Sequence, residues 1–148
     1  MSLFKKKIIC IGTAAVLFLA MALPVLANSG NYAWKMPWDG YYVSGWDNGV
    51  TYNLTAGNLT FSGSVWQYEE KVGAFYPPYS VTTEVWRDDP IWDTKIGSYT
   101  VTPSTTLNDK KSFSKNLGSI IADTYYIVAN KQNTDGWSTA GSGTLKSQ

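Results

Sequence analysis

Apolar and polar residues alternate with a period of two along most of the chain from residue 41 onwards. This period is typical of a β-strand with one buried face, and no stretch shows the spacing of an amphipathic helix. Glycine, asparagine, aspartate and proline residues gather between the alternating runs, where turns are needed. The pattern predicts about eight strands, over residues 41–46, 50–55, 59–66, 80–87, 96–102, 112–117, 124–130 and 138–146.

Strands this short and this evenly spaced are typical of a small antiparallel β-sandwich or barrel. We therefore expect an all-β fold. Residues 41–148 show no linker and no internal repeat, so they are expected to form a single β-sandwich domain. Residues 28–40 precede the first alternating run and are expected to form an extended N-terminal arm.

Two kinds of turn signal predict how the strands connect. Asn48-Gly49 suits the positive backbone angles of a tight hairpin, and 56–58 offers a second short turn, so we expect two linked hairpins over 41–66. Pro77-Pro78 cannot lie in the middle of a sheet, because proline lacks the amide donor that a strand ladder needs. We therefore expect 75–79 to be a crossing loop.

The first residues have the pattern of a secretory signal peptide. Lys5, Lys6 and Lys7 precede an apolar run over 8–22, and small Ala27 suits a cleavage site. We expect residues 1–27 to be removed and the protein to be secreted by a bacterium of the Gram-positive type. The alternative is an uncleaved membrane anchor, for which the apolar run is short.

Charge and composition then exclude several function classes. The full chain has 12 Lys and Arg against 11 Asp and Glu, but removing the three lysines of the signal changes its formal net charge from +1 to −2. No clustered basic stripe remains, so nucleic acid is not an expected partner. The chain has no histidine, which excludes a Ser-His-Asp triad and every histidine-ligated metal site. The one cysteine, Cys10, lies in the signal, so the mature domain is expected to be free of disulfides.

The alternation also assigns strand faces, and through them a candidate binding surface. The apolar residues expected to face the core in two of the strands are Leu59, Phe61, Val65, Val81 and Val85. Trp66 and Trp86 then point outward among serines and threonines, with Glu84 on the same side of its strand as Trp86. These three residues are the candidate binding residues.

An exposed indole beside hydroxyls and a carboxylate suits stacking on the apolar face of a sugar ring. The expected partner is therefore a glycan of the cell envelope or the environment. Three alternatives stay open. The crossing loop or the arm covers both rings as a second small core; the rings sit at a membrane interface in a secreted antimicrobial or membrane-active protein; or they serve self-association in an extracellular matrix protein.

Acidic residues raise two further possibilities. Asp88, Asp89 and Asp93 lie close together in the chain and offer oxygen ligands to calcium, but a turn bonded to its own backbone is the simpler interpretation, and no metal or cofactor is assigned. A glycosidase needs two carboxylates across a cleft, and the sequence places no such pair. We therefore expect a binding protein and not an enzyme.

Overall fold

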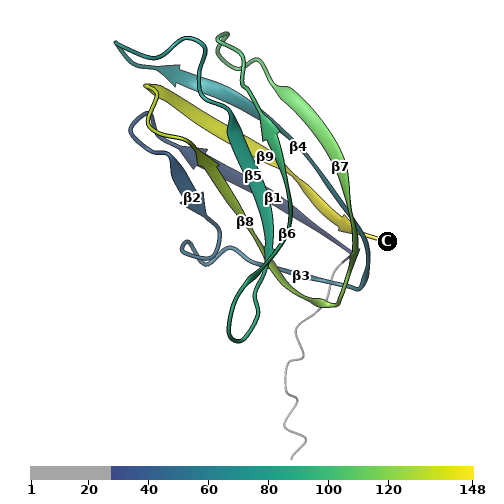
Figure 1. Cartoon of the computed structure of the whole chain (residues 1–148). Coiled ribbons are helices and arrows are strands. Elements are labelled where there is room, and N and C mark those ends of the chain that lie inside the picture. Colours follow the sequence, from purple (N-terminus) through teal and green to yellow (C-terminus); the bar gives the residue numbers. More distant parts are fainter. Residues whose placement is uncertain (1–27) are drawn as a thin grey trace, which may run out of the picture.

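Nine strands form two antiparallel sheets in the part of the chain that the computed structural model describes, residues 28–148 (Figure 1). The predicted signal peptide lies outside this range. One sheet has the order β1-β9-β4-β7, and the other has the order β2-β8-β5-β6, with β3 also paired to β8. The strands are β1 (Ser29–Met36), β2 (Tyr42–Ser44), β3 (Tyr52–Leu54), β4 (Gly57–Glu70), β5 (Val81–Arg87), β6 (Thr94–Val101), β7 (Lys111–Ile120), β8 (Asp123–Lys131) and β9 (Trp137–Ser147). The predicted all-β sandwich is confirmed.

Each of the eight predicted runs overlaps one observed strand, and the ninth strand comes from the predicted arm. Residues 29–36 are extended, but they pair with residues 139–146 of β9 as an edge strand of the first sheet. Tyr32, Trp34 and Met36 alternate inward and are buried, which explains why this segment joins the sandwich. Among residues 28–148 no helix has the length and apolar character needed to cross a bilayer.

The two linked hairpins predicted over 41–66 are not present. Gly49 has the expected positive φ of 68° and ends a tight turn, but the segments on either side of it both pair with β8. β2 lies beside 128–130 and β3 beside 123–125, so they are two parts of one edge strand that is interrupted by the loop 45–51. β4 then crosses to the other sheet, where it pairs with β7 over 57–65 and with β9 over 59–70.

Aromatic rings make up much of the core, and glycines in β9 and β4 provide the space for them. The Phe61 ring is fully buried between the Tyr32 and Phe113 rings. Tyr32 comes from the edge strand and reaches across Gly143 and Gly63, so that its hydroxyl donates to the Ser62 carbonyl oxygen at 3.1 Å. A Cβ atom at either glycine would collide with the Tyr32 hydroxyl. The inward positions predicted for Leu59, Phe61, Val65, Val81 and Val85 are confirmed.

The crossing loop 75–79 connects β4 of one sheet to β5 of the other and is fixed by a buried ion pair. Lys131 Nζ lies 2.5 Å from Asp135 Oδ1, and both side chains are fully buried. Asp135 Oδ2 accepts the Tyr79 amide at 2.9 Å, and the Trp137 indole donates to the Phe75 carbonyl oxygen at 2.8 Å. The loop backbone is therefore attached at both its ends to the connection between β8 and β9.

Candidate functional site

The outer face of the second sheet holds two of the three candidate residues. On β5, Glu84 and Trp86 alternate with buried Val85 and point away from the core. Their neighbours on β8 are Val128 and Tyr126, which point the same way because residues directly opposite in a ladder share a face. This pairing brings together side chains about forty positions apart in the sequence.

These side chains form the floor of a groove with a volume of about 420 Å³. Tyr126 and Val128 are buried at its base, although they lie on the outer face. The walls carry exposed aromatic rings, with Trp92 84% and Tyr42 53% exposed. The groove is lined by Tyr42, Glu84, Trp86, Trp92, Asp93, Tyr126, Val128 and Asn130.

Glu84 fixes the ring of Trp86. The Trp86 indole Nε1 donates to Glu84 Oε2 at 2.8 Å, and Lys95 Nζ pairs with the other carboxylate oxygen. The Trp86 ring is therefore held in one orientation by its polar edge, which leaves its faces for apolar contacts. A carboxylate has about four acceptor positions, so Glu84 keeps capacity for a further donor.

Asp93 is held at the other side of the groove. Its Oδ2 accepts the Tyr126 hydroxyl at 2.6 Å, and its Oδ1 accepts the Asp89 amide at 3.2 Å. Burial, and then the hydrogen bond and negative charge of Asp93, raise the pKa of Tyr126 well above its ordinary value. The phenol therefore stays protonated and keeps its hydrogen bond to Asp93 over the whole physiological pH range.

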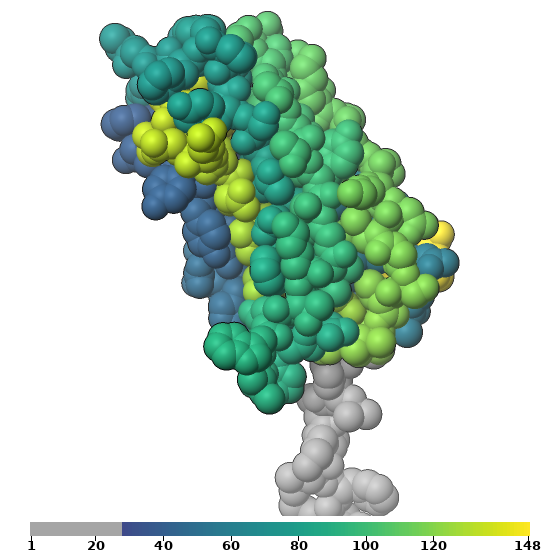
Figure 2. Space-filling view, in the orientation of Figure 1, coloured from purple at the N-terminus to yellow at the C-terminus, as the bar shows by residue number. Residues whose placement is uncertain are grey.

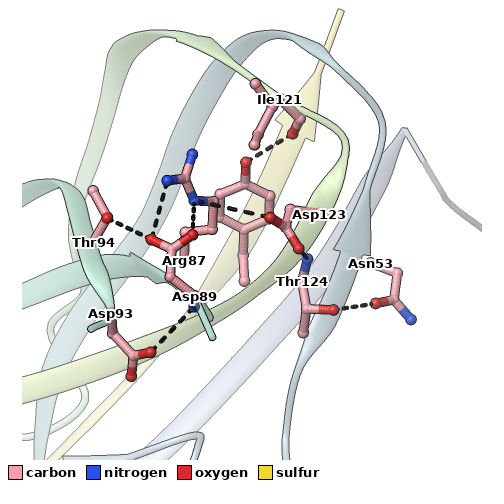
Figure 3. A network of polar contacts seen from close by, with 9 residues as sticks. Asn53, Arg87, Asp89, Asp93, Thr94, Ile121, Asp123 and Thr124 are labelled. Carbon is pink, nitrogen blue, oxygen red and sulfur yellow. Dashed lines mark hydrogen bonds and ion pairs between the residues drawn. The ribbon is translucent and has the colours of Figure 1, made fainter. Parts of the chain in front are cut away.

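The acidic loop after β5 is organised by Arg87, as Figure 3 shows. The Arg87 guanidinium binds the Asp89 carboxylate through two hydrogen bonds of 2.7 and 3.0 Å, and Thr94 donates to the same carboxylate. These hydrogen bonds hold the pKa of Asp89 below its usual range. Burial, with the charges of nearby acids, raises the pKa of Asp88.

This arrangement leaves little basis for a calcium site at Asp88, Asp89 and Asp93. Asp89 is already neutralised by an arginine, and Asp93 accepts two protein donors. Within residues 28–148 no three acidic, cysteine or histidine side chains gather closely enough to hold a metal ion.

Trp66, the third candidate residue, lies on the opposite side of the sandwich. It points outward from β4, as predicted, and Lys110 Nζ lies 4.7 Å from the centre of its ring. It lines a separate hollow of about 260 Å³ beside Ala33 and Lys35. Trp66 and Trp86 therefore do not share a surface, because their strands belong to different sheets.

The alternative that the arm covers the outward tryptophans does not match the placement of the arm. The arm is an edge strand of the first sheet, and its Trp34 packs in the core. Trp66 is instead partly covered by Lys110, and Trp86 lies beside Tyr126 and Glu84. Both rings are partly accessible.

The sequence-based choice missed most of the groove. It did not include Tyr42, Trp92, Asp93, Tyr126 or Asn130. One available signal was the unbroken apolar run over 125–129, which is typical of a strand buried on both faces. The other was the pair of large apolar residues at 91–92 in an otherwise acidic turn.

Comparisons with known proteins assign no family. No family model matches the chain, and no curated protein matches it. A solved structure of Yersinia pseudotuberculosis-derived mitogen (YPM) aligns with 83% of this chain and 88% of its own, with 11% sequence identity and a TM-score of 0.36. A likeness at this level supports no inference about function.

Proposed function

We propose that this domain is a secreted, non-enzymatic binding protein that recognises a glycan of the cell envelope or the environment through the groove around Trp86. One observation carries the proposal: exposed aromatic rings surround carboxylates that are already fixed in place. Flat rings suit the apolar faces of sugars, and fixed polar groups suit their hydroxyls. The site needs little rearrangement on binding, which favours affinity.

The secretion in this proposal rests on the sequence of residues 1–27. Lysines followed by an apolar run and a small residue are the features of a bacterial signal peptide. Mass spectrometry of the protein from a culture supernatant should give a chain that begins at Asn28. A chain that stays with the membrane fraction at its full mass would contradict secretion.

The chemistry of the groove favours binding over hydrolysis. A glycosidase needs one carboxylic acid that donates a proton to the leaving group. Glu84 and Asp93 instead both serve as acceptors, from Lys95 and an indole in one case and from a phenol and an amide in the other. Glu84 is paired with Lys95, so Asp93 is the carboxylate of this groove that opposes binding to an anionic bilayer, since like charges repel.

Retention on insoluble polysaccharide and on peptidoglycan tests the proposal. Wild type should be retained, and Trp92→Ala should lose at least roughly tenfold in affinity, about 1.4 kcal/mol. Trp92 is highly exposed, so its removal should leave the fold unchanged by circular dichroism. Trp66→Ala is the matched control, because it removes an outward tryptophan from the other sheet.

Three results would overturn the proposal. Equal retention of wild type and Trp92→Ala would show that the groove is not the binding site. Release of reducing sugars from the polysaccharide would show an enzyme. Binding to liposomes with a blue shift of tryptophan emission, without retention on any glycan, would favour the membrane-active alternative.

A further inference from the structure

A second hollow lies on the same face of the sheet, next to the crossing loop. Its volume is about 700 Å³, and its walls include Phe75, Tyr76 and Tyr79. Its floor includes Thr82 of β5 and Asn130 of β8, which lie directly opposite each other. Asn130 also lines the groove around Trp86, so the two hollows meet at this residue.

The joined hollows follow the direction of the strands. Thr82 and Trp86 are four residues apart on β5, which is roughly 13 Å at about 3.3 Å per residue. The crossing loop lies before β5 and the acidic loop after it, so they are at opposite ends of the strand (Figure 1). In Figure 2 these two segments project at the upper and lower ends of the same face. Aromatic rings are thus available at both ends of the face.

The Tyr76 ring at the upper end is exposed, as is the Trp92 ring at the lower end. Tyr76 is 62% exposed, and its ring meets Trp137 edge to face, with the centroids 5.3 Å apart. Its hydroxyl donates to Glu70. Trp137 is fully buried and donates a hydrogen bond to the loop backbone, so the Tyr76 ring packs against a side chain that is itself held in place.

Both ends are held by contacts within the protein. At the upper end, the Lys131–Asp135 ion pair binds the loop backbone through the Tyr79 amide. At the lower end, Tyr126 holds Asp93, next to Trp92 in the chain. The backbone that carries the two sets of rings is therefore held in place before any ligand arrives, and a ligand that spans both sets avoids part of the free-energy cost of ordering the loops.

We infer that the two hollows form one binding groove, which takes an extended glycan chain of several sugar units lying along β5 and β8. Such a chain reaches from Tyr76 at one end to Trp92 at the other, and crosses the polar floor at Thr82 and Asn130. This inference rests on the proposed function and adds to it the class of ligand, a linear oligosaccharide instead of a single sugar. Contacts at the two ends act together because one chain joins them.

Isothermal titration calorimetry with soluble oligosaccharides of increasing length tests the inference, with the oligosaccharides prepared from whichever polysaccharide retains the wild type. The hexasaccharide should bind roughly tenfold or more tightly than the disaccharide, about 1.4 kcal/mol. Tyr76→Ala and Trp92→Ala should each weaken the binding of the hexasaccharide. Only one of the two variants should weaken the binding of the disaccharide, because a short ligand contacts only one end of the groove.

Tyr68→Ala serves as the control, because it removes a tyrosine from β4 of the other sheet and should leave hexasaccharide binding unchanged. Loss of hexasaccharide binding in Tyr68→Ala would overturn the inference.

Different results would overturn the extended groove and the proposed function. Equal affinity for both lengths, or full hexasaccharide binding by Tyr76→Ala, would overturn the extended groove and leave the site around Trp86. Absence of wild-type binding to every insoluble glycan would overturn both. The extended groove would be supported if wild type binds the hexasaccharide more tightly than the disaccharide and both Tyr76→Ala and Trp92→Ala lose this gain in affinity.

Discussion

Replacing Phe61 by alanine gives the sharpest test of the strand faces on which the candidate site depends. The ring is fully buried, and its centre lies 5.6 Å from that of Tyr32 and 4.9 Å from that of Phe113. Burying a phenylalanine contributes about 1.5–3 kcal/mol, and each aromatic pair about 0.5–1.5 kcal/mol more. Phe61→Ala should therefore lower the free energy of unfolding by about 3–5 kcal/mol, the range measured for such truncations.

Urea denaturation followed by tryptophan fluorescence measures this loss. A domain of this size has a total stability of about 5–15 kcal/mol, so the variant should still fold and unfold at a much lower urea concentration. Ser62→Ala is the matched control, since Ser62 is the next residue of β4 and points to the opposite face. Its effect should stay within about 0.5 kcal/mol.

Two results would refute the reasoning. A loss below about 1 kcal/mol for Phe61→Ala would mean that the ring is not in the core. A larger loss for Ser62→Ala than for Phe61→Ala would mean that the faces of β4 are reversed. Trp66 would then point inward, and its use as an outward control for Trp92 would fail.

Three further variants test the buried ion pair, the glycine contact and the acidic loop. Lys131→Met should lower the free energy of unfolding by about 3–5 kcal/mol, because it leaves Asp135 charged, buried and unpaired; an unchanged urea midpoint would contradict this. Gly143→Ala should cost roughly 1–3 kcal/mol in the same assay, because the added Cβ atom would collide with the Ser62 carbonyl oxygen of β4 and lie 2.5 Å from the Tyr32 hydroxyl, and wild-type stability would show that β4 and Tyr32 do not approach Gly143 this closely. Asp89 has a lowered pKa in the folded state, so the stability it contributes is present above the ordinary aspartate pKa of about 3.9 and is lost as the pH falls below that value. Asp89→Asn should therefore flatten the fall in melting temperature in this acid range, and a profile as steep as that of wild type would show that the contact with Arg87 does not contribute.

The strands were predictable because their signal is local. A strand with one buried face shows its alternation within a few residues, whatever its partners are. The inward positions of Leu59 and Phe61 followed from this alternation alone, and so did the outward positions of Trp66 and Trp86. Residues 28–40 were expected to form an arm outside the domain, although Tyr32, Trp34 and Met36 repeat with a period of two, and their pairing with β9 makes 29–36 an edge strand.

The connections were not predictable in the same way. Asn48-Gly49 does form a turn, but a turn signal does not determine which strand its flanks will pair with. β2 and β3 both pair with β8, which is far along the chain, because that pairing completes the edge of the second sheet. Long-range pairing depends on how the whole set of strands buries its apolar faces, and the sequence of one hairpin carries no information about it.

Glu84 and Trp86 of the candidate site could be read from the chain, and the larger part of the groove depended on the packing of distant segments. The sequence by itself determined the all-β class, the strand faces and the outward direction of Glu84 and Trp86. The tertiary structure decided that Trp66 lies on the other sheet, and that Tyr126 and Trp92 complete the groove. The physical reason is that side-chain direction follows from local backbone geometry, whereas the neighbours of a side chain follow from strand order, which only the folded sandwich sets.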